Sequence, residues 1–295
     1  MKKLFLPIDV QIDLFDKTVV PILLYGSEVW CPQMCNLATK LQLRFYKLIL
    51  KLGKSTPSYM LFGELGQLPL EIQAKQRMLN FWFKLIKSEN ENKFSSIMYK
   101  FLYQMKENTG YKSTFLNSVE HQLNCLGLSE LWLCQWYPNI LPSASVFKSR
   151  IKQRLFDQYV QEWFEEINNN ELYYNYRMFK TEFCFEKYLN ILPANLVSFL
   201  VKYRTLNHRM PIQKGRFLKM NRSERVCLKC NSGDLGDEFH YLFTCSYFTD
   251  ERKRLIKTYY WKRPNAIKYQ QLLGSSSRLV LLKLVRFIRF ILSEM

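Results

Sequence analysis

The sequence predicts a mainly α-helical protein whose C-terminal third carries a small, basic, metal-binding module. Apolar residues recur at three- and four-residue steps along much of the chain, which is the spacing of one face of an α-helix. No segment alternates apolar and polar residues as a half-buried strand does, and no internal repeat is found. Because 48% of the residues are hydrophobic and 16% are aromatic, the chain has ample material for a buried core.

The first predicted element covers residues 14–30, an apolar stretch interrupted by Pro21. Periodicity alone leaves this stretch open between a buried strand and a kinked helix. We favour a helix because the next segment, residues 37–52, is helical, with apolar residues on one face and basic residues on another. Gly53 is expected to end that second helix.

Further helices are predicted over residues 70–86 and 147–167, and the polar stretches at residues 88–93 and 168–170 are expected to be loops. The composition becomes more basic near Pro193. The predicted organisation is a series of three consecutive regions, which are residues 1–90, 91–195 and 196–295.

The closing segment, residues 279–292, is predicted to be an amphipathic helix. Lys283, Arg286 and Arg289 interrupt it, so it lacks the run of about 18 apolar residues that a membrane-spanning helix needs. Docking on the chain's own core is the default interpretation. Binding to a membrane surface or to a partner protein is the alternative.

The start of the chain imitates the charged end of a secretory signal, but Pro7, Asp9 and Asp13 break the apolar stretch that should follow. We therefore expect an intracellular protein, nuclear or cytoplasmic. In such a reducing compartment, we do not expect the eight cysteines of this 295-residue chain to form disulfides. Cysteines that lie close together in the sequence indicate a metal site instead.

Positive charge is concentrated near the C-terminus. The chain holds 43 Lys plus Arg against 25 Asp plus Glu, a net charge of +18, and residues 202–295 contribute 20 basic and 7 acidic side chains, or +13. A polyanionic partner, either nucleic acid or an anionic membrane, would explain this, because neutralising phosphates releases counterions. The alternative is a solvated basic face.

One group of residues has the spacing of a metal site, Cys-x2-Cys-x9-His-x4-Cys, formed by Cys227, Cys230, His240 and Cys245. A Cys-x2-Cys turn places two thiolates within reach of one ion, and a second pair completes a tetrahedral Cys3His set, which zinc favours. Four protein ligands leave no position for water, so the predicted zinc is structural. The alternative is a chance grouping of cysteines.

The spacing of the second ligand pair also constrains the local structure. His240 and Cys245 lie five residues apart, which is about 140° around an ideal helix. A regular helix cannot direct both side chains at one ion. Residues 241–244 are therefore expected to be irregular or to fray near Cys245.

Basic and aromatic residues surround this pattern in the sequence. The residues predicted to contact nucleic acid are Lys202, Arg204, Arg209, Lys214, Arg216, Lys219, Arg222, Arg225 and Lys229, and Arg252, Lys253, Arg254 and Lys257 follow the pattern. The interleaved aromatic residues are Tyr203, Phe217, Tyr241, Phe243, Tyr247, Tyr259, Tyr260 and Trp261. Cations and stacking rings together bind single strands without sequence readout, although any single ring can instead belong to the core.

The sequence offers no recognisable catalytic centre. None of its seven Asp residues is adjacent to another, and it contains no Gly-rich phosphate loop. His121 and His208 lack an obvious nucleophile partner, and His208 is expected to be a surface contact. We therefore expect the chain itself not to be an enzyme.

Three stretches together resemble the C-terminal half of LINE-type, non-LTR retrotransposon reverse transcriptases. They are TVVPILLYGSEVW (residues 18–30), ELGQLP (residues 64–69) and KYRTLNHRMPIQKGRF (residues 202–217), which leads into the Cys3His pattern. In that family the polymerase palm precedes a helical thumb with a similar Pro-Ile-Leu-Leu-Tyr-Gly-x-Glu-x-Trp sequence, then a helical region and a zinc-knuckle-like element. The middle of the chain carries little of this resemblance.

The resemblance implies that Tyr25, Gly26, Glu28 and Trp30 begin the thumb, and that the zinc ligands belong to an element that grips template RNA or target DNA. It also implies that the palm, with its catalytic Asp pair, lies upstream of this chain. The expected protein is a non-catalytic fragment with a helical thumb-like region, a helical middle and a zinc-knuckle-like module that binds single-stranded or structured RNA or DNA. The alternative function is a peripheral membrane or protein-interaction module that uses residues 279–292.

Overall fold

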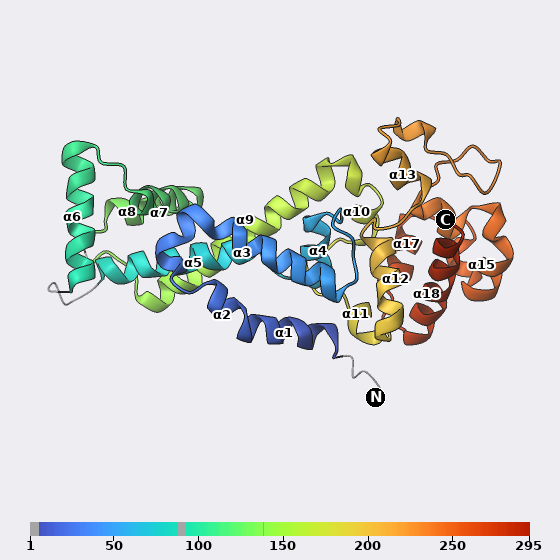
Figure 1. Cartoon of the computed structure of the whole chain (residues 1–295), viewed down its shortest axis with the longest axis horizontal. Coiled ribbons are helices and arrows are strands. Elements are labelled where there is room, and N and C mark those ends of the chain that lie inside the picture. The colour runs from blue at the N-terminus through green and yellow to red at the C-terminus, as the bar shows by residue number, and fades with distance from the viewer. Residues whose placement is uncertain (1–5, 88–92, 138) are drawn as a thin grey trace. The chain divides into compact units, whose positions relative to one another are not determined.

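The computed structural model describes residues 6–87, 93–137 and 139–295, and these residues are mostly helical (Figure 1). Within the described ranges, extended pairing is confined to two isolated bridges, Leu65 with Phe185 and Val226 with Leu235. The predicted mainly α-helical fold is therefore confirmed.

The chain forms two compact units, each assembled from separate parts of the sequence. Unit 1 combines the residues up to 14 with residues 43–67 and 163–295, and unit 2 combines residues 15–42 and 68–162. The boundaries predicted at residues 90 and 195 do not coincide with this division, because residues 43–67 belong with the C-terminal part of the chain. A single sequence shows composition along the chain but not which distant segments pack together.

Unit 2 encloses an aromatic core. Its helices are α2 (Val20–Leu23), α5 (Leu70–Ile86), α6 (Phe94–Thr109), α7 (Thr114–Cys125) and α8 (Ser129–Leu133), with most of α3 (Ser27–Ile49) and of α9 (Ala144–Asn169). Trp82 of α5 is fully buried, and its indole N–H donates to the hydroxyl of Tyr99 at 2.8 Å. Phe83 stacks on Phe147 of α9 with the ring centroids 4.0 Å apart.

The predicted helices are present with small differences at their ends. Residues 14–30 fall in α1 (Ile8–Thr18), α2 and the start of α3, so the helical interpretation of this stretch is correct. Pro21 lies in the first turn of α2, where its missing N–H breaks no helical hydrogen bond. α9 continues to Asn169, so the loop predicted at 168–170 begins later, and residues 88–92 lie outside the described part of the chain.

Unit 1 carries many short elements after α9. They are η1 (Glu171–Tyr173), α10 (Tyr176–Phe179), α11 (Tyr188–Ile191), α12 (Ala194–Arg204), α13 (Pro211–Phe217), η2 (Arg222–Glu224), α14 (Glu238–Phe243), η3 (Ser246–Phe248), α15 (Thr249–Leu255), α16 (Thr258–Trp261), α17 (Ala266–Leu273) and α18 (Arg278–Ser293). Helix α4 (Ser58–Leu65) joins them from the earlier segment. At its end Gly66 adopts a φ of +58°, and a Cβ there would lie 2.4 Å from the backbone nitrogen of Phe185.

The amphipathic helix α18 packs on the core of its own unit. Leu284, Phe287 and Ile288 on its apolar face are fully buried, and α12 and α15 are among the helices that cover it. The default interpretation of residues 279–292, docking on the chain's own core, is therefore correct. No helix in the described part of the chain is long and apolar enough to cross a membrane.

Candidate metal centre and its basic surroundings

The four predicted metal ligands lie together in unit 1. The thiol sulfurs of Cys227, Cys230 and Cys245 and a ring nitrogen of His240 all lie within 4.8 Å of one another. The Sγ atoms of Cys227 and Cys245 are 3.8 Å apart, and Cys230 Sγ is 3.4 Å from His240 Nε2. Such a group could hold one four-coordinate metal ion.

The first ligand pair is positioned by a tight backbone loop. The N–H of Cys227 donates to the carbonyl of Asp234 at 2.8 Å, next to the bridge between Val226 and Leu235. The N–H of Lys229 donates to the Cys227 sulfur at 3.4 Å, so the turn between the two cysteines closes on the first of them. Gly233 turns the chain with a φ of +74°.

The third ligand, His240, is carried by the short helix α14. Asp237 caps the start of this helix by accepting the N–H of His240 at 2.8 Å. The Nδ1 atom of His240 lies 3.0 Å from the hydroxyl of Thr244 and 3.6 Å from a carboxylate oxygen of Asp234. These neighbours fix the ring with its Nε2 atom directed at the sulfurs, which is how outer partners orient a ligating histidine.

The fourth ligand follows immediately after the helix ends. α14 continues through Phe243 and ends at Thr244, and Cys245 precedes η3, so the predicted end of the helix near Cys245 is confirmed. Arg252 fixes this end by donating to the carbonyls of Leu242 at 2.8 Å and of Cys245 at 2.9 Å. Arg252 is only 3% exposed, so it supports the loop and is not the surface cation that its position after the pattern suggested.

The thiols of this group differ in acidity. Burial acts to raise the pKa of Cys230, but hydrogen bonds with Ser232, Cys227 and His240 lower it to about 6. Burial raises the pKa of Cys245 to about 12. Three thiolates this close together would need a compensating positive charge, which a bound cation would supply.

Eight of the nine cations predicted to contact nucleic acid are at least partly exposed. Arg209, Lys214 and Lys219 are exposed, and Lys202, Arg216, Arg222, Arg225 and Lys229 are half-buried. Lys229 forms an ion pair with Glu294 at 3.3 Å and lies over the ring of Tyr247. The ninth cation, Arg204, is fully buried, so its prediction as a nucleic-acid contact is wrong.

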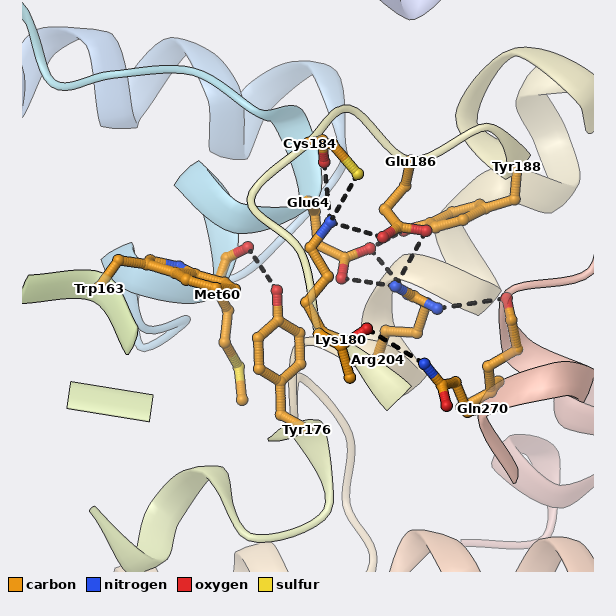
Figure 2. Close-up of polar contacts among 12 residues, drawn as sticks. Met60, Glu64, Trp163, Tyr176, Lys180, Cys184, Glu186, Tyr188, Arg204 and Gln270 are labelled. Atoms are coloured by element: carbon orange, nitrogen blue, oxygen red, sulfur yellow. Dashed lines mark hydrogen bonds and ion pairs between the residues drawn. The ribbon is translucent and has the colours of Figure 1, made fainter. Parts of the chain in front are cut away.

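Arg204 instead occupies a buried ion-pair network (Figure 2). Its Nε and Nη2 atoms donate to the two carboxylate oxygens of Glu64 at 2.8 and 2.9 Å, and Nη2 also lies 3.2 Å from Glu186. Tyr188 donates its hydroxyl to Glu64 at 2.6 Å, and Lys180 pairs with Glu186. Two of the stretches that carry the family resemblance, ELGQLP and KYRTLNHRMPIQKGRF, therefore meet inside unit 1.

The network keeps Glu64 ionised despite its burial. Burial alone would raise the pKa of this carboxyl, but the guanidinium of Arg204 and the hydrogen bonds from Arg204 and Tyr188 hold it below its ordinary value. The ring faces of Phe179 and Tyr188 lie 4.6 and 5.0 Å from the guanidinium carbon. A bidentate, aromatic-lined pair of this kind positions α4 against α12.

Two other expectations for this region need correction. The side chain of His208 is 1% exposed, with Nε2 2.9 Å from a carboxylate oxygen of Glu238, so it is not a surface contact. Among the predicted stacking rings, Tyr203, Tyr241 and Phe243 are core residues. Phe217, Tyr247 and Tyr259 are exposed at 62%, 52% and 56%. A cation of the chain lies over each of these rings: Arg216, Lys229 and Lys268 respectively.

Three of the half-buried arginines line one hollow of about 410 Å³ in unit 1. We call it the arginine hollow; its lining residues are Asn170, Glu171, Leu172, Tyr174, Asn175, Leu206, Ile212, Gln213, Arg216, Met220, Asn221, Arg222, Arg225 and Glu238. Sequence reasoning found the arginines but missed Tyr174, Asn175 and Gln213. Tyr174 and Asn175 lie in the middle of the chain, where neither charge nor residue spacing indicates a functional site.

The residues expected to begin the thumb form a closed turn in unit 2. Gly26 adopts a φ of +67°, and the indole N–H of Trp30 donates to the carbonyl of Tyr25 at 2.7 Å. The guanidinium of Arg77 donates to the carbonyl of Leu24 at 2.9 Å. Gly26 and Trp30 therefore have a clear structural role, whereas the ring of Tyr25 is 85% exposed.

Glu28 lies in a different setting within unit 2. It lines a second hollow of about 730 Å³, together with basic residues that include Lys84 and Lys148. The stretch that contains Tyr25, Gly26, Glu28 and Trp30 thus forms a backbone turn and contributes one acidic side chain to a basic hollow.

Comparisons of the chain with known proteins found no matching family, no matching curated protein and no matching solved structure.

Proposed function

We propose that the Cys3His group holds a structural zinc ion. Around tetrahedral zinc, two sulfur ligands lie about 3.8 Å apart and a sulfur and a nitrogen about 3.6 Å apart. The separations of 3.8 Å between Cys227 and Cys245 and of 3.4 Å between Cys230 and His240 support this ion. Its role is to fix the loop and α14, since four protein ligands leave no position for a reacting water.

Zinc content tests this assignment. We expect one zinc per purified chain, and we expect Cys245→Ser to abolish it. Cys125→Ser is the matched control, because Cys125 also lies close to a histidine, with its sulfur 3.5 Å from His121 Nε2, but is not part of the four-ligand group. A metal-free wild-type protein, or equal zinc loss in both variants, would contradict the proposal.

We also propose that the chain binds single-stranded or structured RNA or DNA, as the thumb and tail of a LINE-type, non-LTR reverse transcriptase in a nuclear or cytoplasmic setting. The observation that carries this function is the exposure of cations that flank the four-ligand group in the sequence. Arg216, Arg222 and Arg225 in particular line one hollow, and none of them forms an ion pair within the described chain.

The proposed role is to grip a strand and not to transfer nucleotides. Guanidinium and ammonium groups contact phosphates, which are the same in every sequence, so binding should be weakly sequence-specific. It should also be steeply salt-dependent, because each phosphate contact on a single strand contributes about −0.7 to the slope of log affinity against log salt.

Fluorescence anisotropy with labelled single-stranded RNA and DNA between about 50 and 200 mM salt measures this slope. We expect affinity to fall steeply over this range. Absent or salt-independent binding would reject the proposal. Primer extension by the purified chain alone would contradict its non-catalytic part.

A further inference from the structure

Basic side chains outnumber acidic ones in the lining of the arginine hollow. Three guanidinium groups line it, whereas its two carboxylates belong to Glu171 and Glu238. The Glu238 carboxylate is already engaged, by His208 at 2.9 Å and by the side-chain amide of Asn175. The lining therefore carries one more positive than negative side chain, and the nearby charges of Asp237 and Glu238 act on Arg222 and Arg216.

The guanidinium groups are held in place before any ligand arrives. Arg225 donates to the carbonyl of Met220 at 2.7 Å and to that of Ile212 at 3.3 Å, and its side chain lies against Gly215, where a Cβ would come within 2.5 Å. The guanidinium of Arg222 lies 4.9 Å from the centre of the Tyr174 ring. The positive charge of Arg225 lies near Arg216, and this charge together with burial lowers the pKa of Arg216.

The hollow also contains polar atoms that lack partners. Asn175 and Gln213 are 5% and 3% exposed, and the Oδ1 atom of Asn175 and the Oε1 atom of Gln213 accept no hydrogen bond from the described residues. Buried acceptors without donors are unfavourable, typically by about 1–3 kcal/mol each. Both oxygens expose less than 1 Å² of surface, so a ligand that offers N–H donors would satisfy them after a rotation of the side-chain amides.

We propose that the arginine hollow binds one nucleotide of a single strand, with its phosphate at Arg216 and Arg222 and a base amino group at Gln213 or Asn175. This inference rests on the proposed nucleic-acid function and specifies that a single nucleotide is recognised at this hollow. A volume of about 410 Å³ is at the lower end of the range of ligand pockets, which suits one nucleotide and not a duplex. Cytosine fits the orphaned oxygens because its N4 amino group donates, whereas uracil presents an acceptor at the same position.

Two charge reversals test the phosphate contact. Arg222→Glu and Lys257→Glu change the net charge equally, but Lys257 is exposed and does not line the hollow. We expect Arg222→Glu to weaken binding of a labelled oligocytidylate at least about tenfold more than Lys257→Glu, since contacts to charged groups are the stronger ones. Arg216→Gln provides a second, milder variant, and zinc content and circular dichroism verify that each variant is folded.

The base contact is tested without changing any charge. Wild-type protein should bind oligocytidylate about three- to tenfold more tightly than oligouridylate of the same length, and Gln213→Leu should reduce this preference. Equal binding of the two oligonucleotides, with Arg222→Glu no weaker than Lys257→Glu, overturns the hollow as a nucleotide site but leaves the proposed function intact. If the wild-type protein binds neither oligonucleotide, the proposed function itself fails.

Discussion

The buried pair of Glu64 and Arg204 is the residue-scale feature with the largest expected effect on stability. Both side chains are fully removed from water, so either one left alone would be an uncompensated charge in the core. Their bidentate contact, with the hydroxyl of Tyr188 as a further donor, compensates for the desolvation. The pair thus specifies how α4 meets α12.

Arg204→Met should lower the free energy of unfolding by about 3–5 kcal/mol in urea titrations, because it leaves Glu64 buried without its main partner. The double variant Glu64→Leu with Arg204→Met should recover a large part of this loss, since both charges are removed. Arg209→Met, at an exposed arginine, should change stability by no more than about 0.5 kcal/mol. Equal effects at the two arginines would show that the buried pair is unimportant.

Acid should weaken the contribution of Glu64. Because the folded protein holds the pKa of this carboxyl below its ordinary value, the stabilisation is fully present above the unfolded pKa of about 4.3 and is lost as the pH falls through the folded value. The difference in stability between wild type and Glu64→Gln should therefore shrink below about pH 4. Acid also affects the Cys3His group, but this effect is the same in both proteins and cancels when their free energies of unfolding are subtracted. A constant difference from pH 7 to pH 3 would contradict this account.

At the scale of single elements, the turn after α4 is constrained by backbone contact. Gly66→Ala would place a methyl group in a left-handed conformation and 2.4 Å from the backbone nitrogen of Phe185. Gly233→Ala carries the same conformational penalty of about 1–2 kcal/mol but has open space around the new methyl group. In urea titrations Gly66→Ala should therefore be clearly the more destabilising of the two. Equal losses would mean that the backbone near Phe185 can move aside.

The helix α14 positions the imidazole ligand through its own last turn. Thr244→Val removes the hydroxyl beside His240 Nδ1 and leaves all four metal ligands unchanged. Loss of such an outer partner should weaken zinc binding about 10- to 100-fold, measured by competition with a chelating dye. Thr249→Val, at a hydroxyl that begins α15, serves as the control and should leave zinc affinity unchanged.

At the scale of the whole molecule, patterns that are local in sequence were predictable. The helical fold followed from apolar spacing, and the grouping of four side chains from the separations between Cys227, Cys230, His240 and Cys245. The end of α14 before Cys245 followed from helix geometry alone. In each case the deciding interaction joins residues that are close along the chain.

Features that depend on distant contacts were not predictable from one sequence. Arg204 looked like one more surface cation, because nothing near it in sequence reveals Glu64, which lies 140 positions away. The same holds for Asn175 and Gln213, which become significant only when their segments line one hollow. The grouping of residues 43–67 with the C-terminal part is a third example.

Because unit 1 combines residues 43–67 with residues 163–295, its parts are synthesised at different times on the ribosome. With elongation at about 5–20 residues per second, the guanidinium that neutralises Glu64 is made about 7–28 seconds after the carboxylate, which precedes it by 140 positions. During that interval the apolar residues around Glu64, such as Met60 and Phe62, have no finished core to enter and are natural substrates for chaperones. Ribosome stalling before the codon for Arg204 should consequently leave nascent chains that are protease-sensitive in residues 43–67.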